Sequence, residues 1–234
     1  MKWKLESDVN DWVKKQLEAL GLKKHKDYNE ESAMSEYLKE ALKGVAKTKT
    51  KTNFGKPDFH VEKYKLPVII ENKKGISKLL SKNKDGVKFE DKDIENYAVN
   101  GALHYSRAMI DRGKYQEVIA VGVAGDSDEN VEIKIYYVFG AGTNAYKELL
   151  KTSTFDFLEN DDIFDNFYKE AILSEEEKHQ ILIDSQTTLQ GYAKRLNKLM
   201  HNHNITAPQR VLYVSGMLLA MQEIKDKDGL KTDG

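Results

Sequence analysis

A short apolar run that ends abruptly in charge constrains the fold of this chain more than any other feature of its sequence. Residues 66–70 read "LPVII", and the next four are Glu71, Asn72, Lys73 and Lys74. A strand that is apolar on both sides is typical of the centre of a sheet whose two faces are covered by helices. The run therefore predicts an α/β fold with this strand near the middle of its sheet.

The segments around this strand predict the other elements. Helical spacing of apolar residues predicts helices over residues 7–20, 30–43 and 93–111. The last of these has a face of small residues suited to close packing on a sheet. Alternation or apolar content predicts further strands over residues 45–52, 58–62, 116–125 and 131–139. The lysine-bearing segment 45–52 suits a protected sheet edge, and residues 76–92 are predicted to form a mobile loop.

The pattern changes to helical after Asn144. We therefore expect an α/β domain over residues 1–143 with a core of about 30–140, a helical extension or connector over 144–224, and a polar tail over 225–234. Capping boxes are predicted at Ser174 with Glu177 and at Thr206 with Gln209.

Composition excludes several classes of protein. The chain has no cysteine, no continuous apolar run of membrane-spanning length and no signal-peptide pattern, so we expect a cytoplasmic protein without a membrane partner. Between Lys43 and Lys88 there are 13 lysines and four acidic residues, a net charge of +9. This asymmetry indicates a polyanionic partner, although a solvated lysine-rich face would give the same pattern.

The end of the apolar strand is a candidate site. Glu71 and Lys73 are two apart and share a face. If the connecting loop runs from Lys63 to Leu66, Asp58 on the preceding strand lies opposite Glu71, about 5 Å away between Cβ atoms. A loop one residue shorter would put the two carboxylates on opposite faces.

Two facing carboxylates repel unless a cation neutralises them. Oxygen ligands suit Mg²⁺ or Mn²⁺, held by Asp58, Glu71 and the backbone carbonyl of Asn72. Lys73 beside the ion would orient water and stabilise charge on a phosphate in the transition state. These residues together indicate a phosphodiesterase. The alternative is a charged strand end at the surface, with Asp58 in a turn.

The motif Pro57-Asp58, followed after thirteen residues by Glu71-Asn72-Lys73, resembles the PD-(D/E)xK nuclease superfamily. Residues 96–109, "NYAVNGALHYSRAM", are similar to the helix that follows the second motif in that family. The chain looks most like the N-terminal nuclease domain of large restriction-modification enzymes. The resemblance implies a restriction-endonuclease-like core, a mixed sheet flanked by helices, followed by a C-terminal helical segment. It also implies Mg²⁺- or Mn²⁺-dependent cleavage of double-stranded DNA, with Asp58 and Glu71 as metal ligands and Lys73 as the catalytic lysine.

Further site residues are expected from the same resemblance. Many family members add a carboxylate from the first core helix, for which Glu36 is the first choice and Glu31 and Glu40 are rivals. DNA contacts are expected from four residues near the motif: Lys56, Lys74, Asn100 and His104. The two helix residues could equally face water.

Neither an NPPY-like methyltransferase motif nor a GxxxxGK[ST] phosphate loop is present. The resemblance therefore implies that methyltransferase or translocase and specificity domains lie outside this chain, and that double-strand cleavage uses a dimer on DNA. Three alternatives stay open: a catalytically silent nucleic-acid-binding or assembly module on the same fold, a structure-specific repair nuclease, and a polyanion-binding regulator without nuclease ancestry.

Overall fold

The computed structural model describes residues 2–31, 33–47, 54–142, 145–171 and 175–227. The chain divides into two compact units, Met1–Ile172 and Leu173–Gly234. The first unit holds the sheet and the candidate site, and it includes residues 144–172, which the sequence assigned to the helical extension.

The first unit mixes strands and helices along the chain. In order they are α1 (Glu6–Ala19), β1 (Tyr28–Glu30), α2 (Glu36–Ala41), β2 (Phe59–Val61), β3 (Val68–Lys74), η1 (Ile76–Lys78), β4 (Lys82–Asn83), β5 (Gly86–Val87), α3 (Asp91–Asn96), α4 (Ala98–Asp111), β6 (Val118–Ser127), β7 (Asn130–Val138), β8 (Tyr146–Glu148), η2 (Asp156–Leu158) and α5 (Asp161–Ala171).

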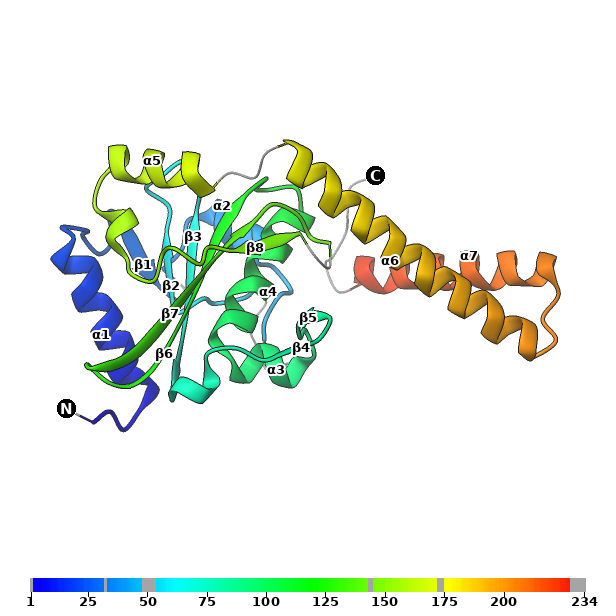
Figure 1. Cartoon of the computed structure of the whole chain (residues 1–234), viewed down its shortest axis with the longest axis horizontal. Coiled ribbons are helices and arrows are strands. Elements are labelled where there is room, and N and C mark those ends of the chain that lie inside the picture. Colours follow the sequence, from blue (N-terminus) through cyan, green and yellow to red (C-terminus); the bar gives the residue numbers. More distant parts are fainter. Residues whose placement is uncertain (1, 32, 48–53, 143–144, 172–174, 228–234) are drawn as a thin grey trace. The chain divides into compact units, whose positions relative to one another are not determined.

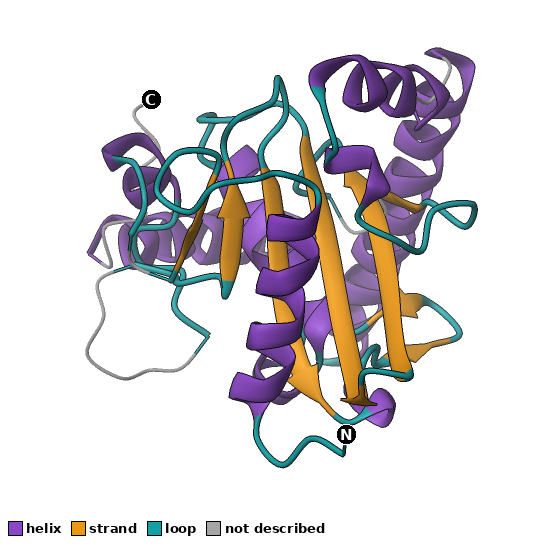
Figure 2. Cartoon of the chain, turned by 90° about the vertical axis from the view of Figure 1, so that its left-hand side faces the viewer, coloured by secondary structure: helices purple, strands orange, loops and turns teal. Residues whose placement is uncertain are grey.

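Six strands form one mixed sheet in the order β1-β2-β3-β6-β7-β8, while β4 and β5 form a separate hairpin. The central pair, β3 and β6, is parallel, and the other neighbours are antiparallel. Helix α1 covers one face of the sheet and α4 covers the other (Figures 1 and 2). The prediction of a central, doubly covered strand is confirmed, because β3 is buried from Val68 to Lys73.

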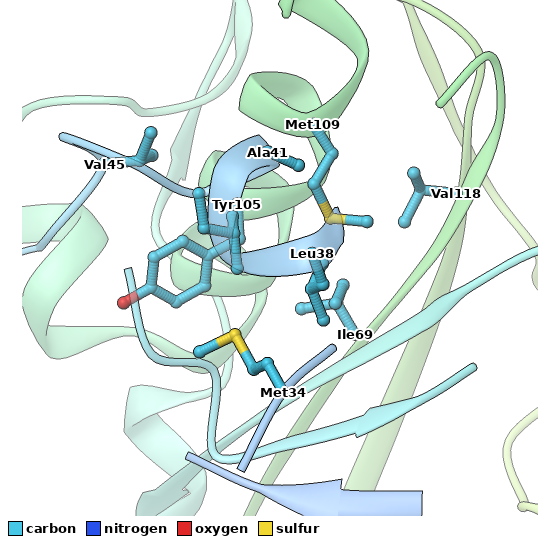
Figure 3. Close-up of a cluster of buried hydrophobic side chains, with 9 residues drawn as sticks. Met34, Leu38, Ala41, Val45, Ile69, Tyr105, Met109 and Val118 are labelled. Carbon is cyan, nitrogen blue, oxygen red and sulfur yellow. The ribbon is translucent and has the colours of Figure 1, made fainter. Parts of the chain in front are cut away.

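The two faces of β3 pack against different helices. Ile69 contributes to a core cluster with Leu38 of α2 and with Tyr105 and Met109 of α4 (Figure 3). Ile69 and Glu71 therefore lie on the face that α4 covers, and Asn72 lies on the face that α1 covers. The long Lys73 side chain, at the strand end, reaches Glu6 of α1. Gly122 of β6 permits close approach of α4, since a Cβ at this position would lie 2.5 Å from Val99 Cγ2.

The segment before β2 differs from its prediction. The helix predicted over residues 30–43 begins only at Glu36, because Glu31 has a positive φ of 45° and Ser35 caps the helix by accepting a hydrogen bond from the backbone N–H of Leu38. The sheet edge is formed by β1, three residues long. Most of the predicted edge strand 45–52 lies outside the described residues.

Two further predictions need correction. The helix predicted over 93–111 is two helices, since Tyr97 has extended backbone angles. The predicted loop 76–92 contains η1 and the β4–β5 hairpin, which is anchored to α4 by the Asn100 side chain.

Strand β8 and helix α5 complete the first unit and were not predicted individually. The Tyr64 ring, in the turn between β2 and β3, stacks on Phe164 of α5 with 4.3 Å between centroids. Aromatic packing of this kind holds α5 against the turn that sets the register of β2 and β3.

The second unit consists of α6 (Glu175–Asn202) and α7 (Ala207–Lys227). The backbone N–H of Thr206 donates to Gln209 Oε1 at 2.9 Å, so this predicted cap is present, whereas Ser174 lies outside the described residues. Both helices expose large apolar side chains, among them Leu189, Tyr192, Leu199, Leu212, Tyr213 and Leu219. No helix within the described ranges is long and apolar enough to cross a membrane.

Candidate active site

The register of β2 against β3 places two carboxylates opposite each other. Phe59 pairs with Ile70, so the next position brings Asp58 opposite Glu71, as the sequence predicted. The backbone N–H of Asn72 donates to Asp58 Oδ2 at 2.7 Å and fixes the orientation of that carboxylate. A strand end and a single backbone hydrogen bond therefore hold the pair in place.

Glu71 is buried and Asp58 is half-buried. The Glu71 residue is 0% exposed, and its Oε1 has no hydrogen-bond partner among the described residues. Burial, together with the neighbouring charge of Glu71, raises the pKa of the Asp58 carboxyl to about 7. Two carboxyl groups thus lie close together, an arrangement that favours a cation bound between them.

Helix α4 lies against the Glu71 carboxylate. A Cβ at Gly101 would lie 3.3 Å from Glu71 Oε2 and 3.1 Å from the Ile94 carbonyl oxygen. Only a very small residue leaves room for the Glu71 carboxylate at this position.

Lys47 enters the site from the segment that follows α2, and sequence analysis missed it. Its ammonium forms an ion pair with Glu71 Oε2 and lies 5.4 Å from the centroid of the Tyr105 ring. Burial opposes the charge of Lys47, but the carboxylates outweigh it and raise the pKa of the ammonium. The only signal in the sequence was the lysine-rich run 43–51, which gives no indication that one of its members turns inward.

Lys73 lies beside the carboxylates and is held by α1. Its Nζ is 2.7 Å from Glu6 Oε1, and the residue is 8% exposed. Glu6, in the first turn of α1, is therefore the helix carboxylate that contacts the motif. The signal for it was an acid at a predicted helix start, but nothing in the sequence connects that turn with Lys73.

Asn72 connects the candidate site to its surroundings through both its side chain and its backbone. Its side-chain amide donates to Asn10 Oδ1 of α1 at 3.0 Å. Pro67 and Gly75 bond to β6, and alternate residues of a strand direct their backbone groups to opposite neighbours. The N–H and carbonyl of Asn72 therefore point away from β6, towards the side on which Asp58 lies.

These donors fit a divalent ion. Two facing carboxylates and a backbone carbonyl are hard oxygen ligands, and Glu71 Oε1 is a buried acceptor without a hydrogen-bond partner among the described residues. The described part of the chain contains no group of three His, Cys, Asp or Glu residues able to hold a metal. Water would have to complete the coordination, which is usual for Mg²⁺.

The expected helix carboxylates do not contact the motif side chains in the described contacts. Glu36 pairs with Lys39 at 2.7 Å, and its side chain is 87% exposed. Glu40 pairs with Lys114 at 2.9 Å. Glu31 comes nearest, but only its backbone N–H is involved, donating to the Asp58 carbonyl at 3.2 Å. The extra carboxylate was expected from the helix over residues 30–43, whereas the helix whose carboxylate contacts Lys73 is α1.

The expected DNA contacts divide into two groups. Asn100 is fully buried, and its side chain bonds to the backbone of Ser81 and Lys88, so it anchors a hairpin rather than facing a ligand. His104 is mostly buried, with Nε2 3.3 Å from the Val45 carbonyl oxygen, and burial lowers its pKa to about 4. Lys56 and Lys74 are half-buried near the motif, and their role stays a prediction.

Similarity to a known protein extends over almost the whole of this chain. The chain is a distant homologue of a type II restriction enzyme and methyltransferase. That relative is RM.BcgI of Heyndrickxia coagulans, which is 30% identical over 228 residues, covering 93% of this chain and 33% of the relative. The chain thus spans about a third of the length of this relative. No family model matches the chain, and no solved structure matches it.

Proposed function

We propose that this chain is a divalent-metal-dependent endonuclease module of the PD-(D/E)xK type, which hydrolyses phosphodiester bonds in double-stranded DNA as part of restriction-modification. The single observation that carries the proposal is the placement of Asp58 opposite Glu71, with Lys73 two residues further along the same strand. The homology to a restriction enzyme and methyltransferase supports the same reading.

Each residue has a role that follows from its position. Asp58, Glu71 and the Asn72 carbonyl would hold Mg²⁺ or Mn²⁺, which supplies the positive charge that polarises a phosphate oxygen. Lys73 would orient the attacking water and stabilise charge that develops on the phosphate. Glu6 would hold the Lys73 ammonium in place, since the two side chains form an ion pair at 2.7 Å.

DNA would be bound chiefly through lysines. Asn100 and His104 are engaged inside the protein, so they do not serve this purpose. The β4–β5 hairpin and the turn before it expose lysines beside the start of α4, namely Lys78, Lys82 and Lys84. Together with Lys56 and Lys74 they would contact phosphates, a mode of binding that weakens as salt rises.

The partners follow from the length of the relative. Because this chain corresponds to a third of a restriction enzyme and methyltransferase, we propose that methylation and target recognition reside in parts of the enzyme other than these residues. Cleavage of both strands would require two copies of the module on the DNA.

Cleavage of supercoiled plasmid tests the proposal. With Mg²⁺ or Mn²⁺ the wild-type protein should nick or linearise the plasmid, and EDTA should abolish the reaction. Lys73→Ala and Asp58→Ala should each reduce cleavage at least about a hundredfold. Lys15→Ala, an exposed lysine on α1, is the matched control and should retain activity.

A catalytically silent nucleic-acid-binding module on the same fold is the second candidate. The observation that favours it is the ion pair between Lys47 and Glu71, which neutralises one of the two proposed ligands without a metal. Duplex binding without metal-dependent cleavage, in wild type and in Lys73→Ala alike, would support this candidate. A preference for branched over linear duplexes would instead indicate a structure-specific repair nuclease.

A further inference from the structure

The Lys47 ammonium is paired with Glu71, one of the two carboxylates that the proposed metal would bind. It contacts Glu71 Oε2, while Glu71 Oε1 beside it has no partner among the described residues. Asp58 lies opposite Glu71 in the strand register, on the same face. Among the described residues, Lys47 is therefore the cation paired with this couple of carboxylates, since the Lys73 ammonium is directed to Glu6.

The backbone near Lys47 is fixed firmly enough to make this contact specific. Val45, two residues before it, belongs to the core cluster shown in Figure 3. The Val45 carbonyl oxygen lies 3.3 Å from His104 Nε2. The Lys47 side chain is 15% exposed and crosses the Tyr105 ring, whose hydroxyl points away from the cluster (Figure 3). A random surface lysine would not be enclosed in this way.

Charge balance decides what happens when a divalent ion arrives. Two carboxylates and one ammonium carry a net charge of −1, so the metal-free site is nearly balanced. Two carboxylates and a divalent ion are already neutral, and the ammonium then becomes an excess like charge a few ångströms from the metal. Repulsion between the two cations beside the buried Glu71 carboxylate makes simultaneous binding unfavourable.

We propose that Lys47 is a built-in competitor of the metal: it holds Glu71 in the metal-free protein and leaves Glu71 when Mg²⁺ or Mn²⁺ binds. The exchange rests on the proposed function, because it requires a divalent ion at Asp58 and Glu71. It lowers the affinity of the free protein for metal, and it releases a lysine next to the position of the scissile phosphate.

Calorimetric titration with Mn²⁺ tests the exchange without reference to cleavage. Lys47→Met should bind Mn²⁺ about tenfold more tightly than wild type, because no internal cation has to be displaced. Lys15→Met should match wild type, and Lys47→Arg, which keeps the charge, should not gain affinity. Unchanged or weaker binding by a folded Lys47→Met protein would overturn the proposal.

A second measurement uses the wild-type protein and does not depend on the folding of any variant. Amine acetylation followed by mass spectrometry should show Lys47 protected in EDTA and at least about threefold more reactive at saturating Mn²⁺, once it has left Glu71. Lys15 should be equally reactive in both conditions. Continued protection of Lys47 in metal-saturated protein would also overturn the exchange.

Failure of the exchange is distinguishable from failure of the proposed function. If Mn²⁺ binds to wild type, is lost in Asp58→Ala, and leaves Lys47 unaffected, the nuclease proposal stands and the exchange is wrong. If neither wild type nor Lys47→Met binds Mn²⁺ and neither cleaves DNA, the metal-dependent function itself is wrong. Binding by Lys47→Met alone would support strong competition by Lys47.

Discussion

His104 shows how a single buried side chain makes stability depend on pH. Burial lowers its pKa to about 4, whereas an unfolded histidine titrates near about 6.5. The unfolded state therefore takes up this proton at a higher pH than the folded state. Stability is complete above pH 6.5 and is lost as the pH falls, by about 3 kcal/mol at pH 4.

Urea unfolding at pH 7.5 and pH 5 measures this loss. His104→Gln should lose less free energy of unfolding between the two pH values than wild type does. His25→Gln, at an exposed histidine, should behave as wild type. An identical pH dependence in wild type and His104→Gln would show that His104 is not the group responsible.

Substitution of Glu6 should affect the rate of cleavage without affecting the stability of the fold. It forms its ion pair with Lys73 while 45% exposed, and ion pairs at such positions contribute less than about 1 kcal/mol to folding. Glu6→Gln should therefore unfold within a few degrees of wild type. If Lys73 acts in cleavage, the same variant should cleave plasmid about tenfold more slowly, because the ammonium is less well positioned. Asp11→Asn on the same helix is the control, and equal rates for all three proteins would contradict the role of Glu6.

The sequence predicted those residues whose relation is local. Asp58 and Glu71 were brought together correctly because strand parity and a short turn fix their register. Lys47 and Glu6 were missed because their contacts depend on the path of the chain between elements. No periodic pattern relates Glu6 to a strand residue 67 positions later.

At the scale of elements, Asn100 joins a helix to a hairpin. Its side-chain NH2 group donates to the carbonyl oxygens of Ser81 and Lys88, and its side-chain oxygen accepts from the Ser81 N–H, at distances between 2.7 and 3.0 Å. Asn100→Ala would leave buried backbone groups unpaired, at about 1–3 kcal/mol for each group that water cannot reach. We expect a loss of about 2–4 kcal/mol in total stability and faster amide exchange in β4 and β5.

Hydrogen exchange by mass spectrometry separates these effects. The matched variant is Asn96→Ala, an exposed asparagine of the preceding helix. Exchange in the hairpin should rise in Asn100→Ala and stay at the wild-type level in Asn96→Ala. A hairpin as protected in Asn100→Ala as in wild type would show that this side chain does not anchor it.

Elements were predicted well where periodicity was strong and poorly where tertiary contacts overrode it. The central strand β3, the pair β6 and β7 and helix α1 follow from their apolar patterns. Strand β1 was not predicted, because three residues are too few to show alternation, and its last residue, Glu30, was placed in a helix. The hairpin β4–β5 was assigned to a loop, because its order comes from Asn100 rather than from its own composition.

At the scale of the whole molecule, the two units differ in how many buried apolar side chains they contain. Among the described residues, all buried apolar side chains but one belong to the first unit, the exception being Met200 of α6. A protein of residues 1–171 should therefore fold cooperatively, with a melting temperature within about 5 °C of the full chain. Residues 173–234 alone should be only partly helical, as circular dichroism would show. Cooperative folding of residues 173–234 alone, together with failure of residues 1–171 to fold, would contradict this division.

The parallel pairing of β3 with β6 has a consequence for how the site comes into being. Asp58 and Glu71 lie on strands joined by a short turn, so this pair can assemble early. Gly101, which packs against Glu71, belongs to α4 in the long crossover between β3 and β6. These two strands pair only after a large loop has closed. Contacts of high sequence separation form slowly. The two repelling carboxylates are therefore brought together before α4 covers Glu71. The rate-limiting step of folding would also be the step that buries this carboxylate.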